Sequence, residues 1–250
     1  MGISKIRVAK IVLGGIGGIS VSLLTSSLMS IPRPTNIDSA NSSVKISKRP
    51  TKGNVPATGR DPSCPAIPVG MPDITPLTPA LTPSDKSEDS VIVTLSQSPT
   101  FRFYSPYSKG IYRFRLLPEN KDVSKTLYRQ DIPIASTGIF TVSLPMIKSL
   151  KTKKNYFWEL EYLCTKDPEA INPIVFGYLY RDQLTASQKQ EFSRANTSAQ
   201  RIDFYRKNDL WVELLDEIAK SYPQSRTIWQ QTLDAEELQS ISKKPLLLTK

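Results

Sequence analysis

The residue types that most often carry out catalysis are sparse in this chain of 250 residues, which contains no histidine. This absence excludes Ser-His-Asp and Cys-His catalysis and removes the commonest nitrogen ligand of metal ions. An enzyme with this sequence would depend on carboxylates, lysine, tyrosine or cysteine alone. We therefore expect no enzymatic activity, no cofactor and no metal site.

Two carboxylates, Glu159 and Glu161, stand two positions apart in a run that alternates apolar and polar residues. On a strand they would share one side, about 7 Å apart. Glycosidases instead place their paired carboxylates on opposite sides of the scissile bond. The solvated face of a sheet is therefore the better explanation, and a histidine-free hydrolase is the weakest functional hypothesis.

The two cysteines, Cys64 and Cys164, have neither a metal-ligand spacing nor the spacing of a C-x-x-C redox pair. An even number of cysteines in an exported chain favours a disulfide between them, which would contribute about 2–4 kcal/mol if unstrained. Two separate reduced thiols are the alternative. A catalytic thiol is disfavoured because no neighbouring residue offers a base.

Positive charge is in excess, with a formal net charge of +10. This surplus would attract the protein to an anionic glycan or a membrane surface. A basic composition without a reader motif is weak support for nucleic-acid binding, which we do not expect. Four lysines gather in one predicted turn, where they could contact an anionic surface, although a solvated turn is the favoured explanation. These lysines are Lys148, Lys151, Lys153 and Lys154.

Aromatic residues supply the candidate partner-binding positions. Tyr178 and Tyr180 could belong to a patch that stacks on a sugar, although core packing and sheet propensity explain them more simply. Trp211 and Trp229 fall on apolar stripes of two predicted helices. Each stripe either packs internally, which is favoured, or receives another protein.

The strands expected to position these residues lie between Val91 and Tyr180. Residues 100–104 and 111–117 alternate apolar and polar side chains around a Pro/Gly turn, which is typical of strands with one buried face. Short strands with no crossover helices between them predict a mainly β fold, an antiparallel, immunoglobulin-like β-sandwich. The other expected strands are 91–95, 125–130, 138–144, 156–164 and 174–180.

The hydrophobic period changes to that of a helix after Arg181. Residues 207–222 form the strongest predicted helix, which has Asn208 or Asp209 as its N-cap and ends at Pro223. A second helix is expected from Ser225. Together these predict a C-terminal helical hairpin that packs on the sandwich, and a polar helix is also expected over residues 185–194.

The organisation of the whole chain follows from composition. Residues 1–30 have the layout of a signal peptide or N-terminal anchor, because basic residues precede the uncharged run 11–31. Residues 31–90 contain 11 of the 20 prolines and predict a mobile Pro/Ser/Thr-rich linker. The sandwich is expected over 91–182 and the helical segment over 183–250. The protein is thus expected in the periplasm or outside the cell, either released or anchored through residues 11–31.

Several blocks of the sequence fit one known pattern. They are Ser98-Pro-Thr-Phe-x-Phe-Tyr-x-Pro-Tyr107, Tyr156-x-Trp158 leading to Cys164, Gly177 before Arg181, and Leu210-Trp211 at the head of a helix. These blocks resemble the cyanobacterial domain-of-unknown-function 928 family. Where that family tends to show Gly-Ile-Trp-Tyr-Asp-Ala-Leu, this chain has Asp209-Leu-Trp-Val-Glu-Leu-Leu215. The resemblance implies an exported domain without an established activity, associated with membrane sensor or tetratricopeptide-repeat proteins, so it carries over no catalytic residue.

These observations favour a non-enzymatic, exported cell-envelope protein that acts as a protein-interaction module, with another envelope protein as its partner. The alternative is a β-sandwich that binds an extracellular glycan or a small ligand. A solvent-open, aromatic-lined groove containing Tyr178 or Tyr180 would support that alternative. The hydrolase hypothesis would need an acid in a cleft that faces a second acid.

Overall fold

The computed structural model describes residues 64–78, 91–165 and 171–247. The predicted signal or anchor at 1–30 and its uncharged run at 11–31 lie outside the described residues. Of the predicted linker at 31–90, only residues 64–78 are described. None of the helices in the described ranges has the length and apolar character needed to cross a lipid bilayer.

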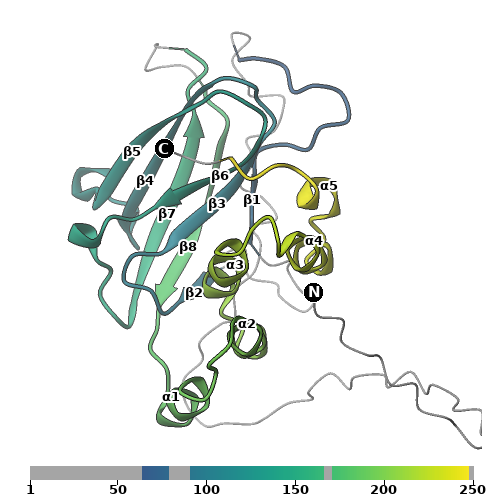
Figure 1. Cartoon of the computed structure of the whole chain (residues 1–250). Helices are drawn as coiled ribbons and strands as arrows, with labels where there is room; N and C mark the ends of the chain where they lie inside the picture. The colour runs from purple at the N-terminus through teal and green to yellow at the C-terminus, as the bar shows by residue number, and fades with distance from the viewer. Residues whose placement is uncertain (1–63, 79–90, 166–170, 248–250) are drawn as a thin grey trace, which may run out of the picture. The chain divides into compact units, whose positions relative to one another are not determined.

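The described chain is mainly β, with strands arranged in two sheets (Figure 1). One sheet has three strands in the order β1-β3-β6, and the other has five in the order β2-β8-β7-β4-β5. The strands are β1 (Thr75–Pro76), β2 (Val91–Thr94), β3 (Thr100–Ser105), β4 (Gly110–Pro118), β5 (Tyr128–Ile134), β6 (Gly138–Ser143), β7 (Lys154–Tyr162) and β8 (Ile174–Arg181).

The five-stranded sheet is mixed, because β2 and β8 run parallel, with Val91 opposite Tyr178. The prediction of a wholly antiparallel sandwich was wrong at this pair. Parallel neighbours need a long connection, and the sequence contains no crossover helix between consecutive strands that would signal one. Here the five strands β3 to β7 lie between β2 and β8 in the sequence, so no crossover helix is required.

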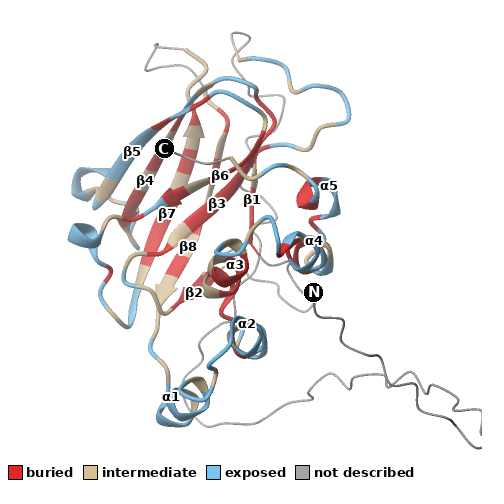
Figure 2. Ribbon diagram, in the orientation of Figure 1, coloured by how far each residue is buried: buried red, intermediate tan, exposed pale blue. Residues whose placement is uncertain are grey.

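Aromatic side chains from both sheets fill the space between them. Phe103 of β3 lies 5.5 Å from Trp158 of β7, measured between ring centroids, and Tyr112 of β4 lies 4.9 Å from Phe140 of β6. Figure 2 shows the buried positions recurring along the strands, as expected for sheets with one inward face. Gly177 is required opposite the indole, because a Cβ there would lie 2.7 Å from Trp158 Cζ2.

The C-terminal helical region packs on the outer face of the three-stranded sheet (Figure 1). Tyr104 and Ile139 of that sheet share an apolar cluster with residues of the third, fourth and fifth helices. The helices are α1 (Ala186–Phe192), α2 (Ser198–Lys207), α3 (Trp211–Ala219), α4 (Arg226–Ala235) and α5 (Gln239–Ser242).

The start of α3 differs from the prediction. Leu210 is its N-cap and no side chain caps it, whereas Asn208 is the C-cap of α2 and donates from Nδ2 to the Phe204 carbonyl. Residues 207–209 therefore end one helix rather than begin the next. Asp209 has a φ of 53°, which is the left-handed conformation that reverses the chain between the two helices.

The segment that contains β1, residues 74–77, is held in place by packing and by hydrogen bonds. Ile74 and Leu77 are buried, and β1 pairs with β3. Trp211 Nε1 of α3 donates to the Leu77 carbonyl at 2.8 Å. This segment therefore joins the three-stranded sheet to the helices above it.

Candidate anion-binding groove

A groove of about 1020 Å³ lies beside the loops that connect β4 to β5 and β6 to β7. Each loop contains a short 3-10 turn, η2 (Val123–Lys125) and η3 (Met146–Lys148). The groove is lined by five lysines and one carboxylate, Lys125, Lys148, Lys151, Lys153, Lys154 and Glu119. The two loops thus bring cationic residues from distant parts of the sequence to one site.

Local hydrogen bonds fix the β4–β5 loop. Asp122 Oδ1 accepts from the Ser124 amide at 3.0 Å and caps η2. Thr126 Oγ1 donates to the Val123 carbonyl, and the Leu127 amide donates to Leu116 of β4. These bonds hold the turn against the end of its own strand.

The β6–β7 loop is anchored to the sandwich by Leu150, which is buried and whose amide donates to the Gln97 carbonyl at 2.9 Å. The Leu150 carbonyl accepts from the Arg181 guanidinium at the end of β8. The Lys151 amide donates to the Tyr156 hydroxyl at 2.6 Å. The loop therefore presents its lysines from a fixed backbone.

Two of the five lysines have a carboxylate partner. Lys125 pairs with Asp122 at 3.0 Å, and Lys153 pairs with Asp182 at 2.6 Å, a hydrogen bond that raises the pKa of Lys153. Glu119 accepts from Asn155 Nδ2 at 2.8 Å. Within the described ranges, no carboxylate forms an ion pair with the other three lysines, which are all exposed: Lys148, Lys151 and Lys154.

The two candidate tyrosines lie in different surroundings. Tyr180 lines the groove and is half-buried. Tyr178 belongs to an aromatic cluster on the outer face of the five-stranded sheet, with its ring centroid 5.3 Å from that of Phe157. The Lys121 ammonium lies 5.2 Å from the Tyr178 ring centroid, within the range of a cation–π contact.

The two candidate tryptophans, Trp211 and Trp229, are both buried in the apolar cluster between the helices and the three-stranded sheet. Neither contributes to the cationic groove. A separate hollow of about 400 Å³ beside Trp211 is lined by residues of α2, α3 and α4, by Asp209 between α2 and α3, and by Glu236 after α4.

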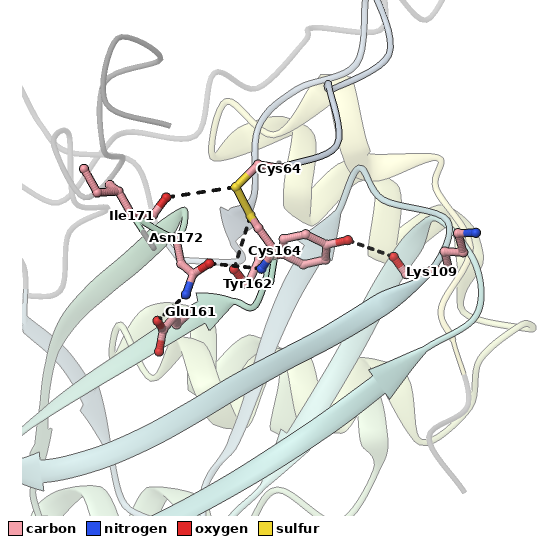
Figure 3. Close-up of a disulfide and its surroundings, with 7 residues drawn as sticks. All are labelled: Cys64, Lys109, Glu161, Tyr162, Cys164, Ile171 and Asn172. Atoms are coloured by element: carbon pink, nitrogen blue, oxygen red, sulfur yellow. Dashed lines mark hydrogen bonds between the residues drawn. A yellow bond between two sulfur atoms is a disulfide. The ribbon is translucent and has the colours of Figure 1, made fainter. Parts of the chain in front are cut away.

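Cys64 and Cys164 form the predicted disulfide, with their Cα atoms 4.6 Å apart (Figure 3). Asn172 Oδ1 accepts from the Cys164 amide at 3.0 Å, and Asn172 Nδ2 donates to Glu161 Oε1 at 2.9 Å. The Tyr162 hydroxyl donates to the Lys109 carbonyl. This end of the sandwich is thus closed by covalent and polar links.

A family model described as Domain of Unknown Function (DUF928) matches residues 56–246. The chain belongs to the DUF928 family. The match includes both cysteines, both sheets and every described helix. Among curated proteins, none matches this chain.

The paired acids Glu159 and Glu161 of the DUF928 domain lie on the outer face of β7. Both pair with Arg115 of β4, Glu161 at 3.2 Å. They do not face each other across a cleft. Among the described residues, no group of three or more cysteines and acids could hold a metal ion.

One group of polar residues was missed in the sequence, the acids of α3. Glu213 Oε1 accepts from Thr94 Oγ1 and the Leu95 amide, both at 2.7 Å, and from the Ser96 amide at 3.1 Å. Burial raises the pKa of Glu213, and these hydrogen bonds partly oppose the rise. The carboxylate docks α3 on the end of β2.

The next two acids of α3 extend this docking. Asp216 pairs with Arg102 of β3 at 2.6 Å, and burial raises the pKa of Asp216. Glu217, whose side chain is 1% exposed, pairs with Arg201 of α2 at 2.7 Å and with Lys220 at 2.6 Å. Burial opposes ionisation of Glu217, but these hydrogen bonds outweigh it and lower its pKa to about 2. These acids hold helices in place and do not line the groove.

Proposed function

We propose that this DUF928 domain is a non-enzymatic, exported binding module of the cell envelope, and that it holds an acidic region of an envelope protein in the lysine groove. The observation that supports this proposal is the set of three exposed lysines that have no carboxylate partner among the described residues, Lys148, Lys151 and Lys154, on a backbone fixed at Leu150. Charges placed in this way attract an anionic partner and orient it during encounter.

A binding role is supported over catalysis by the arrangement of the acids. Glu159 and Glu161 share Arg115, and Glu217 is ionised in contact with two cations. A catalytic acid needs a raised pKa in a cleft that admits substrate. The raised pKa values in α3 belong instead to carboxylates, such as Glu213, that hold the helix on the sheet.

Export is supported by the disulfide, because disulfides persist mainly in oxidising compartments such as the periplasm and the extracellular space. The basic start and the uncharged run at 11–31 agree with that destination. The proposal therefore places the domain outside the cytoplasm.

The proposal includes an immunoglobulin-like arrangement of the two sheets. If β1, β3 and β6 are equated with strands A, B and E, then β8, β7, β4 and β5 follow the order G-F-C-C′. This order supports an immunoglobulin-like sandwich to which β2 adds a strand beside β8. The disulfide departs from that pattern, since it links the segment before β1 to the end of β7.

The test is capture of envelope proteins by the tagged full chain. The Lys148→Glu, Lys151→Glu, Lys154→Glu variant is expected to lose its partner, and added salt is expected to weaken capture by the unchanged chain. The matched control is the Lys109→Glu, Lys189→Glu, Lys243→Glu variant, because these three lysines are exposed outside the groove. Equal loss in both variants would show a dependence on total charge and contradict a role for the groove.

An anionic glycan is the second candidate, and the position of Tyr180 favours it. This half-buried ring lines an open groove, the arrangement expected of a sugar-binding β-sandwich. Titration with a uronic-acid oligosaccharide, followed by amide NMR shifts, tests this candidate. Shifts confined to residues 148–155 and to Tyr180, absent in Tyr180→Ala, would favour the glycan over the protein partner.

A further inference from the structure

Exposed apolar side chains lie beside the lysine groove. Val123 of η2 is 58% exposed, Met146 of η3 is 63% exposed and Ile147 is 89% exposed. Leu127, which lines the groove with Ile147, is 38% exposed. Leu127 and Ile147 come from different loops and line the same groove, and exposed hydrophobic residues that gather in this way mark an interaction site.

The exposure of Ile147 is built into the fold. The Sδ atom of its neighbour Met146 accepts from Ser98 Oγ at 3.3 Å, and the Lys148 amide donates to the Pro145 carbonyl at 2.8 Å. Buried Leu150 fixes the other end of the turn. Ile147 therefore projects from a turn that is held on both sides.

We propose that the part of the domain that carries η2, η3 and the lysine groove docks on the surface of an anionic lipid bilayer. Ile147, with Val123 and Leu127, inserts at the boundary between headgroups and acyl chains, while Lys148, Lys151 and Lys154 contact the lipid phosphates. This inference rests on the anionic-ligand site of the proposed function, and it assigns the lysines of that site to lipid phosphates in place of an acidic region of a protein.

The combination of features favours a bilayer over the other anionic partners. A soluble polysaccharide offers phosphate-like or carboxylate charges to the lysines but no apolar phase for Ile147. A bilayer offers both within a few ångströms, and it is a fluid surface that admits two separate apolar turns. The exposed hydrophobic residues and the lysines then act on one ligand.

The expected effects on bilayer binding follow from its two contributions, the charge of the lysines and the insertion of Ile147. Removal of one lysine that faces an anionic surface is expected to weaken binding about fivefold, which corresponds to about 1 kcal/mol. The Lys148→Ala, Lys151→Ala, Lys154→Ala variant should therefore bind about 100-fold more weakly. Ile147→Ser should lose about tenfold through partial withdrawal of its side chain from the acyl boundary.

The experiment measures binding of the full chain to vesicles of mixed phosphatidylglycerol and phosphatidylcholine, and to vesicles of phosphatidylcholine alone. Sedimentation gives the affinity of each variant, and amide hydrogen exchange locates the contact. Residues 1–63 are identical in all variants, so any membrane affinity of theirs is common to every measurement. The matched controls are Ile228→Ser, on an exposed isoleucine of α4, and the Lys109→Ala, Lys189→Ala, Lys243→Ala variant.

The inference requires slower exchange in residues 119–127 and 146–154 with phosphatidylglycerol, weaker binding of both groove variants and unchanged binding of both controls. Protection elsewhere, or an Ile147→Ser variant that binds as the unchanged chain does, overturns it. If the groove lysines are then still needed to capture an envelope protein, the proposed function stands without this inference. If vesicles bind through the groove and no protein does, the bilayer replaces the protein partner.

Discussion

The acids of α3 and the lysines of the groove are both clusters of charge, but the acids form contacts within the fold and three of the lysines are exposed to solvent. Glu213, Asp216 and Glu217 each meet donors from another part of the chain, from Thr94, Arg102 and Arg201. Lys148 and Lys151 project from the β6–β7 loop and Lys154 from the start of β7, with no such partner among the described residues.

The difference separates charges that stabilise the domain from charges to which we assign, as a proposal, the binding of a ligand. A buried carboxylate is tolerated only when donors replace the water that it loses, so its removal or theirs destabilises the fold. An exposed lysine adds little to stability, and its effect appears when an anion binds. Each region can therefore be changed with a different expected readout.

The largest expected effect is from Glu217→Ala. It leaves Arg201 and Lys220 without their shared carboxylate between α2 and α3. We expect the free energy of unfolding to fall by about 3 kcal/mol, as measured by urea denaturation at pH 7. A loss of less than about 1 kcal/mol would mean that the pair contributes no more than a surface ion pair does.

The pH dependence of stability sharpens the role of the same residue. Because the pKa of Glu217 falls from 4.5 to about 2 on folding, its contribution is complete above pH 4.5 and is lost as pH falls toward 2. The stability difference between the unchanged chain and Glu217→Gln should shrink by about 2 kcal/mol between pH 7 and pH 3. Taking a difference removes the opposite contribution of Glu213 and Asp216, whose raised pKa values favour the folded state in acid.

A smaller effect is expected from Glu213→Ala, which leaves the Leu95 and Ser96 amides without their acceptor. We expect a loss of about 1.5 kcal/mol in urea denaturation. Glu213→Gln is the matched control, because its amide oxygen can still accept from these donors. Equal losses in the two variants would show that ionisation, and not acceptance by one oxygen, holds α3 on β2.

The smallest effect on stability is expected in the groove. The Lys148→Ala, Lys151→Ala, Lys154→Ala variant should unfold within about 0.5 kcal/mol of the unchanged chain, while its affinity for an anionic ligand falls. Thermal denaturation and vesicle binding of one preparation test both statements. A marked loss of stability would show that the groove lysines also stabilise the fold, which would contradict the contrast with the acids of α3.

The sequence predicted most strands because alternation records burial on one face, as in β3, β4 and β7. It placed the fifth strand at 125–130, whereas β5 covers Tyr128–Ile134, since the polar residues of η2 carry no clear boundary. It missed α2, whose residues are mostly polar and bury only Ile202 and Phe204.

The site was predicted only in part, for a similar reason. The lysines at 148–154 and Tyr180 stood out as residues, but their assembly with Lys125 and Glu119 depends on two loops meeting in space. The acids of α3 occupy the polar stripe of an amphipathic helix, which in sequence is indistinguishable from a solvated face. Only their partners on β2, β3 and α2 distinguish the two.

The bond between Cys64 and Cys164 also determines how the protein responds to mechanical tension. A pull applied ahead of residue 64 and at the C-terminus passes through the two sulfurs to Cys164 and then into the chain that follows it, toward β8. Residues 65–163 lie inside the covalent ring, so tension cannot extend this part of the polypeptide until the disulfide is reduced. Under oxidising conditions only the chain outside this ring, which includes β8 and the helices, can be extended, whereas both loops of the groove lie inside the ring.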